Sequence, residues 1–200
     1  MRGTVTVPDC RLDPATAHLW TIDVEALDEP AFASLAAPLS EEEQDRASRF
    51  RFPRDRRTFV AAHGLVRQAL SWAMPGVAPQ DWRFAATREG RPEIAAPAVV
   101  RRPRFNLSSS AGRVACVVTA DSDCGVDLQA MSGLRDLDLL SGNVLAAAER
   151  GEMAALPDDQ RLERFFRLWT LKEAYAKACG LAPSCRSTGW PSAGDRTRSC

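Results

Sequence analysis

Two lysines and a glutamate close to one another in the sequence are the side chains best suited to bind a charged group. The stretch from 165 to 180 reads FFRLWTLKEAYAKACG, and its Lys172 and Lys177 are the only lysines in a chain with 26 lysine and arginine residues. A compact ammonium at these two positions alone indicates that a point charge is needed there. Glu173 precedes Lys177 by four residues, a spacing that also suits an ordinary ion pair on a helix surface. A charged site and a surface ion pair are both open interpretations of this stretch taken alone.

The same stretch has the periodicity of a helix. Apolar residues recur at steps of three and four, which is the pattern of an amphipathic helix. We expect this helix to begin near Gln160 and to end at Gly180, because glycine commonly follows the last helical turn. The apolar stripe consists of Leu168, Leu171, Tyr175, Ala178 and Cys179.

An acidic residue in a predicted strand is a candidate metal ligand. Residues 113–120 (RVACVVTA) predict a buried strand, and residues 124–129 (CGVDLQ) predict a second strand after a turn. Side chains alternate along a strand, so Asp127 and Gln129 face the same way. A carboxylate at the end of a buried strand suits a hard cation, although an edge residue without that role fits the pattern as well.

Two further segments are candidates for anion contacts. Residues 105–110 (FNLSSS) place three serines after an apolar strand end, where hydroxyls and backbone amides can meet an anion. Residues 88–94 (REGRPEI) contain Gly90, which marks a tight turn, and Pro92, which excludes a helix. Taken alone, the second segment predicts only a turn.

A cluster of arginines lies at the junction of two predicted helices. Ser40 and Glu43 form a capping box, which predicts a helix from 41 to 50. A second helix is expected from 55 to 73, because Pro53 interrupts the first. The arginines form either a solvated face or an anion site, since a guanidinium pairs well with phosphate. They are Arg46, Arg49, Arg51, Arg54, Arg56 and Arg57.

Composition limits the classes of partner. The 200 residues are 45% hydrophobic and carry no net formal charge, so the chain fits one domain or two small ones, without an overall field for nucleic acid or membrane. The first ten residues lack a signal-peptide pattern, and no apolar run approaches the ~18 residues that cross a bilayer, so we expect a cytoplasmic protein. The six cysteines include no CxxC pair, and we expect reduced thiols rather than a zinc site.

Four of these segments, taken in order, resemble one enzyme family. They are GRPEI, FNLSSS, GVDLQ and FFRLWTLKEAYAKACG. They are similar to the 4'-phosphopantetheinyl transferases of the Sfp-like (surfactin-synthetase-activating) type, whose patterns are G-[KR]-P, FNLSHS, G-[IV]-D-[IV]-E and W-[ST]-x-K-E-[AS]-x-x-K. The resemblance extends from residue 41 to residue 180 and is best after Gly90. No single segment is decisive, and the order of the four carries the resemblance.

The resemblance implies a group transfer. Enzymes of this family move the 4'-phosphopantetheine arm of coenzyme A to a serine of an acyl or peptidyl carrier protein, and they release adenosine 3',5'-bisphosphate. Mg²⁺ bridges the pyrophosphate. The attacking hydroxyl then belongs to the partner, so the enzyme has to position the substrates and neutralise charge. The resemblance also implies a monomer whose partners are coenzyme A and a carrier protein. From the composition we expect no nucleic-acid or membrane partner.

The resemblance assigns roles to individual residues. The implied metal ligands are Asp127, Gln129 and Glu173. The implied catalytic residues are Glu149, which would help to activate the acceptor serine, and Lys177. The implied contacts to coenzyme A are Arg54, Arg57, Gly90, Arg91, Pro92, Ser108, Ser109, Lys172 and Lys177.

Three positions depart from the family pattern. Ser109 replaces a histidine that contacts phosphate, Gln129 replaces a frequent glutamate, and His63 replaces a frequent arginine. Glutamine coordinates a metal through its carbonyl oxygen but brings no charge. An alternative is therefore a non-catalytic module that binds coenzyme A or a carrier protein. A generic α/β protein without such a site is a third possibility, which the four ordered segments disfavour.

The expected fold class is α/β (α+β), with two similar pseudo-symmetric halves and the site between them. We expect an N-terminal half at 1–122 and a C-terminal half with the metal and phosphate motifs at 123–180. Residues 181–200 have neither period of regular structure and are expected to form an irregular tail. The second half is thus expected to be truncated at its C-terminus, and a frameshift in the gene would produce such a tail.

Overall fold

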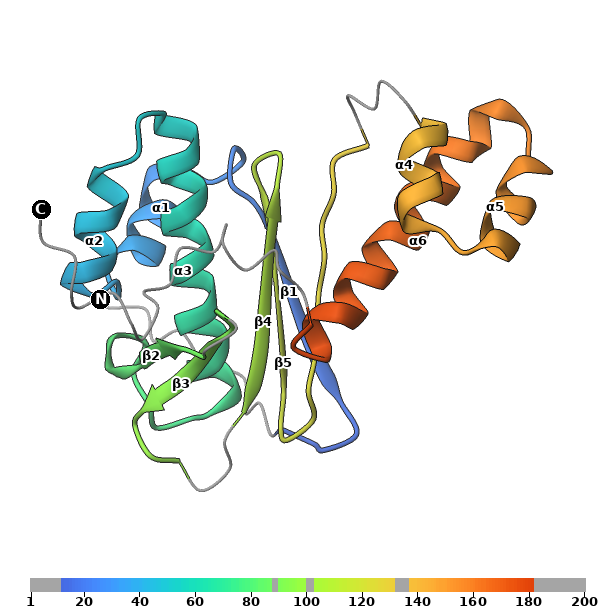
Figure 1. Ribbon diagram of the computed structural model, residues 1–200. Coiled ribbons are helices and arrows are strands. Elements are labelled where there is room, and N and C mark those ends of the chain that lie inside the picture. Colours follow the sequence, from blue (N-terminus) through green and yellow to red (C-terminus); the bar gives the residue numbers. More distant parts are fainter. Residues whose placement is uncertain (1–11, 88–89, 100–102, 132–136, 182–200) are drawn as a thin grey trace, which may run out of the picture.

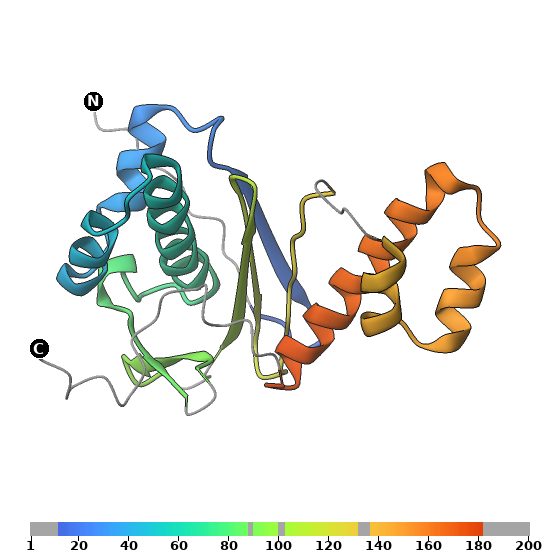
Figure 2. The ribbon, with the colours of Figure 1, turned by 45° about the horizontal axis from the view of Figure 1, so that its top comes forward.

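The computed structural model describes residues 12–87, 90–99, 103–131 and 137–181. A three-stranded sheet stands between two groups of helices (Figures 1 and 2), with α1, α2 and α3 on one side and α4, α5 and α6 on the other. This mixture confirms the predicted α/β fold class. In chain order the elements are β1 (Ala17–Asp23), α1 (Glu29–Ala36), α2 (Glu41–Ser48), α3 (Pro53–Ala73), the short helix η1 (Pro79–Asp81), β2 (Arg83–Ala86), β3 (Pro92–Ala96), β4 (Arg104–Ser110), β5 (Arg113–Thr119), α4 (Leu137–Val144), α5 (Ala147–Ala154) and α6 (Asp158–Ala178).

The main core lies between the sheet and α3. The strands are antiparallel in the order β1, β5, β4, so β5 is central. Alternate residues of β5 (Val114, Cys116 and Val118) are fully buried, and they share one apolar cluster with Val66 and Leu70 of α3. The strand period of two and the helix period of 3.6 therefore bring two apolar faces together.

The elements predicted up to β5 are present, with small shifts at their ends. The predicted helices at 41–50 and 55–73 correspond to α2 and α3, and the predicted strand at 113–120 corresponds to β5. α3 begins earlier than predicted because Pro53 occupies its first turn, where a missing amide hydrogen breaks no helical bond. Gly90, with φ of 86°, lies in the turn between β2 and β3.

The prediction of a strand at 124–129 is wrong. This segment is extended, but its backbone amides bond to side chains of β4 and not to a neighbouring backbone. Side chains on one face of β4, which point away from α3, supply the acceptors. Side chains of β4 therefore take the place of the backbone ladder that a neighbouring strand would form. The donor–acceptor pairs are Val126 to Asn106 Oδ1, Leu128 to Ser108 Oγ and Ala130 to Ser110 Oγ, at 3.0, 3.1 and 3.0 Å.

Three helices form a separate apolar cluster beyond the sheet. The sequence from 141 to 156 predicts a single helix, whereas the structure has α4 and α5, which are divided at Ala146. Ala146 has an extended backbone, and its amide donates to Oε2 of Glu149 at 2.7 Å. The cluster contains Leu145, Met153, Phe165 and Phe166. In the described part of the C-terminal half there is no strand, so the pseudo-symmetry of the two halves stays a prediction.

α6 is present as predicted, but its stripe is not buried. Leu171 and Tyr175 are 61% and 71% exposed, whereas the buried apolar residues of α6 are Phe165 and Phe166 on its earlier turns. The helix ends as expected at Gly180, whose φ of 71° is the left-handed conformation typical of this position. Periodicity thus predicted the helix correctly, but the residues of its stripe are not its buried face.

The remaining predictions about the chain are tested only in part. Cys116 and Cys124 are buried free thiols and Cys179 is an exposed one, and the other three cysteines lie outside the described residues. Burial raises the pKa of the Cys116 thiol, as expected for an inert core cysteine. No helix in the described ranges is both long and apolar enough to cross a membrane. Residues 182–200 of the predicted tail lie outside the described residues.

Candidate active site

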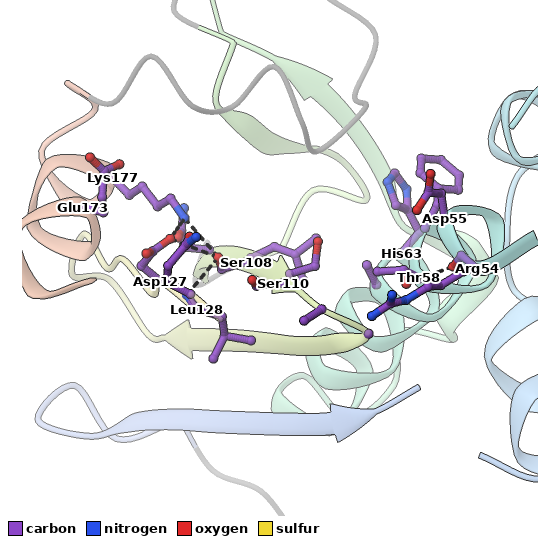
Figure 3. Close-up of a pocket in the computed structure, with 18 of the residues that line it drawn as sticks. Arg54, Asp55, Thr58, His63, Ser108, Ser110, Asp127, Leu128, Glu173 and Lys177 are labelled. Carbon is purple, nitrogen blue, oxygen red and sulfur yellow. Dashed lines mark hydrogen bonds and ion pairs between the residues drawn. The ribbon is translucent and has the colours of Figure 1, made fainter. Parts of the chain in front are cut away.

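A cavity of about 850 Å³ lies between α3, β4, the extended segment after β5, and α6. Figure 3 shows Glu173 and Lys177 of α6 on one side, Arg54 and Thr58 of α3 on the other, and Ser108 of β4 between them. Motifs that are far apart in the sequence therefore meet around one space. Eight of the predicted site residues line it: Arg54, Pro92, Ser108, Ser109, Asp127, Gln129, Glu173 and Lys177.

The centre of the cavity wall is a buried ion pair. Nζ of Lys177 lies 2.6 Å from Oδ1 of Asp127, and the two side chains are 9% and 10% exposed. The ammonium also donates to the carbonyl oxygen of Val126 at 3.1 Å and to Oγ of Ser108 at 3.2 Å. An ammonium has three donors, so the hydrogen-bonding capacity of Lys177 is used completely.

Ser108 is the junction of this network. Its hydroxyl donates to Oδ1 of Asp127 at 3.1 Å and accepts from Lys177 and from the amide of Leu128. One donor and two acceptor positions are all that a hydroxyl has. The serine of the FNLSSS motif thus fixes both the extended segment and the ion pair.

A glycine brings the extended segment against α6. A Cβ atom at Gly125 would lie 1.9 Å from the carbonyl oxygen of Ala174 and 2.8 Å from the amide nitrogen of Ala178. Any other residue at this position would push the segment away from the helix. The glycine of the GVD motif is therefore required for close approach, which places Asp127 within reach of Lys177.

The oxygen donors in the cavity are of the type that binds a hard cation. Asp127 and Glu173 contribute carboxylates to the lining, and Gln129 contributes an amide. Within the described residues, no group of three or more His, Cys, Asp and Glu side chains could hold a metal ion. Mg²⁺ usually takes one or two carboxylates and completes its shell with water and substrate phosphate, so this donor set fits Mg²⁺ although it is not a full protein cage.

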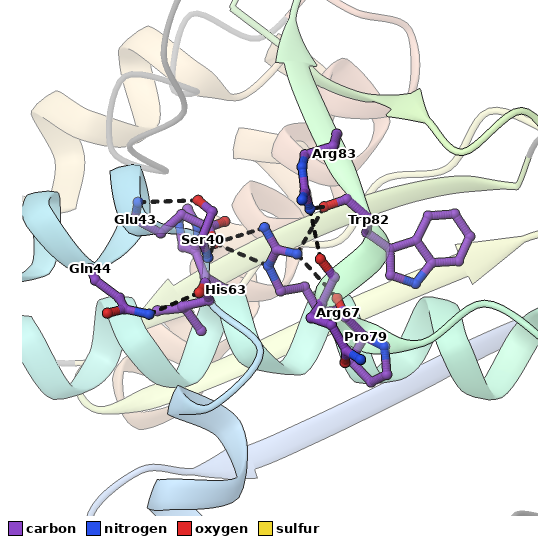
Figure 4. A network of polar contacts seen from close by, with 10 residues as sticks. Ser40, Glu43, Gln44, His63, Arg67, Pro79, Trp82 and Arg83 are labelled. Atoms are coloured by element: carbon purple, nitrogen blue, oxygen red, sulfur yellow. Dashed lines mark hydrogen bonds and ion pairs between the residues drawn. The ribbon is translucent and has the colours of Figure 1, made fainter.

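A second buried network supports the opposite wall (Figure 4). His63 lines the cavity, and its Nδ1 lies 2.9 Å from Oε1 of Glu43. Arg67 contacts Oε2 of Glu43 through Nε at 3.0 Å and Nη2 at 2.8 Å, and its Nη1 donates to the carbonyl oxygens of Pro79 and Trp82. Burial raises the pKa of Glu43, but the hydrogen bond with His63 and the charge of Arg67 hold it below its ordinary value.

The role of Glu43 in this network was not predicted from the sequence. The capping box was predicted correctly, since Ser40 and Glu43 bond to each other's backbone amides. Its carboxylate also reaches two side chains of α3. The available signal was the spacing of His63 and Arg67, which are four residues apart and so share one face of α3.

Two predicted site residues meet each other outside the cavity lining. Nζ of Lys172 lies 2.8 Å from Oε2 of Glu149, which also accepts from the amide of Ala146. The hydrogen bond from Lys172 is the main reason why the pKa of Glu149 is below its ordinary value. A carboxylate with a lowered pKa is a weaker general base. In this structure, the contact between Lys172 and Glu149 joins α6 to α5.

Three further predicted residues also lie outside the cavity lining. Nη1 of Arg57 pairs with Oε1 of Glu29 at 3.0 Å, and the guanidinium stacks on Phe32. Gly90 forms its turn, and Nη1 of Arg91 donates to the carbonyl oxygen of Ala178 at 3.2 Å. The predicted contacts of these residues to coenzyme A stay predictions.

Comparison with known proteins identifies the family. A model described as 4'-phosphopantetheinyl transferase, N-terminal, matches residues 28–122, and a model of the 4'-phosphopantetheinyl transferase superfamily matches residues 123–192. The chain is 36% identical over 173 residues to the 4'-phosphopantetheinyl transferase HetI of Nostoc sp., which covers 86% of this chain and 72% of that protein. The chain belongs to the 4'-phosphopantetheinyl transferase family of enzymes. This confirms the family and the enzyme class predicted from the motifs, and the Sfp-like subtype stays a prediction.

Other members of the family are more distant. A phosphopantetheinyl transferase of Thraustochytrium sp. is 29% identical over 181 residues, and a 4'-phosphopantetheinyl transferase of Bacillus subtilis is 26% identical over 147 residues. The matches cover 84% and 73% of this chain and 62% of each relative. The chain therefore spans less than two thirds of these two relatives.

Proposed function

We propose that this family member transfers the 4'-phosphopantetheine arm of coenzyme A to a serine of an acyl or peptidyl carrier protein. The observation that carries the proposal is the cavity of about 850 Å³, because residues of all four family motifs line it together. A volume of this size is within the range of pockets for small molecules and cofactors. We further propose that the enzyme works as a monomer in the cytoplasm, without nucleic acid or membrane.

The charges around the cavity suit the phosphates of coenzyme A. Lys177 provides a buried ammonium on α6, and Arg54 provides a guanidinium on α3 that is 60% exposed and paired loosely with Glu25 at 3.4 Å. Ser109 is exposed and also lines the cavity. A phosphate that enters from solvent can therefore meet the exposed guanidinium first and the buried ammonium afterwards.

Asp127, Glu173 and Gln129 would hold the Mg²⁺ that the family uses. When bound, this ion supplies positive charge to the pyrophosphate oxygens. The residues around it act by position: Ser108 orients Asp127, and Gly125 allows the close contact with α6 that brings Lys177 to the same point.

The reaction exchanges one phosphorus–oxygen bond for another. The serine oxygen of the carrier forms a bond to the phosphorus of the phosphopantetheine phosphate, and the bond from that phosphorus to the bridging oxygen breaks. Adenosine 3',5'-bisphosphate leaves with the bridging oxygen and its electron pair, and the serine proton passes to a base. Glu149 is the predicted base, and it has to leave the hydrogen bond with Lys172 to act at full strength.

The test is transfer from a fluorescent coenzyme A to a purified carrier protein, with and without Mg²⁺. We expect labelled carrier only with Mg²⁺, and none with a carrier whose acceptor serine is changed to alanine. Circular dichroism on the same sample shows whether the chain is folded. A folded chain that binds coenzyme A without transfer would contradict the proposal and would identify the non-catalytic module, for which Ser109 and Gln129 are the sequence argument.

A further inference from the structure

Arg91 is held rigidly at the start of β3. Its amide donates to Oγ1 of Thr87 at 3.2 Å, and its carbonyl oxygen accepts from the amide of Thr87 at 2.7 Å. Gly90 makes this turn possible with its φ of 86°. The residue is 8% exposed, so its side chain leaves a fixed backbone and runs through the protein interior.

The guanidinium of Arg91 ends at the last turn of α6. Nη1 donates to the carbonyl oxygen of Ala178 at 3.2 Å, across 87 residues of sequence. The final carbonyls of a helix lack helical partners and carry partial negative charge, so a cation is favourable there. Among the described residues, the backbone bonds that close this end leave the Ala178 carbonyl out, since they run from Gly180 to Lys177 and from Leu181 to Ala176.

The guanidinium of Arg91 also contacts an exposed carboxylate, that of Asp123. Nη2 of Arg91 lies 3.3 Å from Oδ1 of Asp123, as an ion pair without hydrogen-bond geometry. The same oxygen accepts from Arg104, whose Nη2 and Nε are 2.8 and 3.1 Å away. Asp123 thus stands between two arginines and steadies the end of the Arg91 side chain.

The last turn of α6 carries Lys177, the residue next to Ala178. Gly125 packs against the backbone of this turn, and Arg91 bonds to the carbonyl oxygen of Ala178 in it. We propose that Arg91 is a positioning residue, which holds the last turn of α6 so that the ammonium of Lys177 reaches Asp127 and the cavity. This task differs from the direct nucleotide contact predicted from the sequence. Its effect on catalysis rests on the proposed function, but the geometry it maintains is independent of coenzyme A.

The presence of only two lysines makes the position of Lys177 measurable in the free protein. Brief acetylation with acetic anhydride, followed by mass spectrometry of the peptides, reports the reactivity of each amine. Lys177 is buried and fully bonded, whereas Lys172 is 39% exposed and serves as the internal reference. We expect Lys177 to be the slower of the two in the unchanged chain.

The variants separate the donor of Arg91 from its bulk. Arg91→Met keeps an apolar stem and removes the donor, and we expect it to raise the reactivity of Lys177 relative to Lys172 by about tenfold, the scale of one lost charged hydrogen bond. Arg91→Lys retains a donor and a charge, and we expect it to restore slow reaction in part. Arg83→Met is the control, because Arg83 lies exposed on β2, the strand paired with β3, and donates to the carbonyl oxygens of Gln80 and Trp82.

Each outcome decides the inference. An unchanged ratio in folded Arg91→Met would overturn it, and so would an equal rise for both lysines, which is the result of general loosening. If Arg91→Met does not fold, Asp123→Asn replaces it, with a smaller rise expected because that side chain is 59% exposed. In the transfer assay, Arg91→Met should raise the KM for coenzyme A and leave the KM for the carrier unchanged. If Arg91→Met changes the reactivity of Lys177 relative to Lys172 but the unchanged chain never transfers phosphopantetheine, the proposed function is refuted and the positioning role of Arg91 stands.

Discussion

Nζ of Lys177 and Oδ1 of Asp127 lie 2.6 Å apart in a chain where the two residues are separated by 50 positions. Each residue neutralises the other in a place that water hardly reaches. The charge of Lys177 is therefore available to a phosphate only in combination with the charge of Asp127. Any cation at Asp127 has to share that carboxylate with the ammonium, which makes the pair the central element of the site.

The first prediction concerns the stability of this pair. Asp127→Asn leaves a buried ammonium without its counter-charge, and we expect it to lower the free energy of unfolding by about 3 kcal/mol, the scale for breaking a buried ion pair. The double variant Asp127→Asn with Lys177→Met should recover most of that loss. Urea unfolding followed by circular dichroism measures both.

The control for this prediction uses the other lysine. Lys172→Met breaks the more exposed pair with Glu149, and we expect a much smaller loss, because solvent screens an exposed ion pair. Equal losses from Lys172→Met and from Asp127→Asn would show that the buried pair has no special weight.

The second prediction concerns the metal ligands. Glu173→Gln removes one of two carboxylates from the cavity, and we expect Mg²⁺-dependent transfer to fall to background while the fold persists. Gln129→Glu adds a carboxylate, and we expect it to lower the Mg²⁺ concentration needed for half-maximal rate by about tenfold, because ligand charge sets the affinity for hard cations. Calorimetric titration with Mg²⁺ checks both variants apart from turnover.

Glu163→Gln is the matched control, since Glu163 is an exposed residue of the same helix. It should leave both the rate and the Mg²⁺ titration unchanged. Normal transfer by Glu173→Gln would remove Glu173 from the metal site.

The third prediction concerns pH and the network of Figure 4. The pKa of Glu43 is lowered on folding, so the ionised carboxylate stabilises the fold above its ordinary value of 4.5, and this stabilisation is lost as the pH falls through the folded pKa. At neutral pH, Glu43→Gln should lower the free energy of unfolding by about 3 kcal/mol, because Arg67 stays buried without its counter-charge. The difference between the two proteins should shrink as the pH falls below 4.5. A constant difference from neutral to acid pH would contradict the assigned charge.

The fourth prediction uses two glycines. Gly125→Ala should abolish transfer and weaken the fold, because its Cβ atom would lie 1.9 Å from a backbone oxygen of α6. Gly151→Ala is the control within α5, where nothing lies within 4 Å of the added atom, and it should stabilise the protein by about 0.5–1 kcal/mol. Thermal unfolding and the transfer assay give the comparison. A fully active Gly125→Ala would mean that close packing against α6 is not needed.

The success of prediction depended on whether a feature is local. α3 and α6 are long and periodic, and both were predicted from spacing alone. The division between α4 and α5 was missed because Ala146 is neither a glycine nor a proline and is a poor cap residue, so no local signal marks it. The family motifs predicted that Asp127 and Lys177 belong to one site. The direct contact between them depends on the close packing of Gly125 against α6, and the spacing of residues in the sequence does not predict such packing.

The same distinction explains the misread segment at 124–129. Alternation shows which residues face the same way, but not whether their partner is a backbone or a row of side chains. Glu43 was recognised as a cap because the cap is local, and its contacts with His63 and Arg67 depend on how α2 docks on α3. Arg91 was assigned to the nucleotide by its motif, whereas its bond to Ala178 spans 87 residues.

The attachment of the extended segment to β4 affects how mutational data on this protein should be interpreted. Side chains at three positions of β4 each accept a hydrogen bond from the backbone amide 20 residues further along the chain: Asn106, Ser108 and Ser110. Replacing Ser108 with alanine removes the anchor of a distant loop together with a partner of the Lys177 ammonium. In an alanine scan of the FNLSSS motif, a loss of activity would therefore combine two effects: displacement of the extended segment and a change at the Lys177 ammonium. Among the three serines, Ser109 lies on the opposite face of β4 and lines the cavity, so its replacement tests the contact with substrate without removing an anchor of the extended segment.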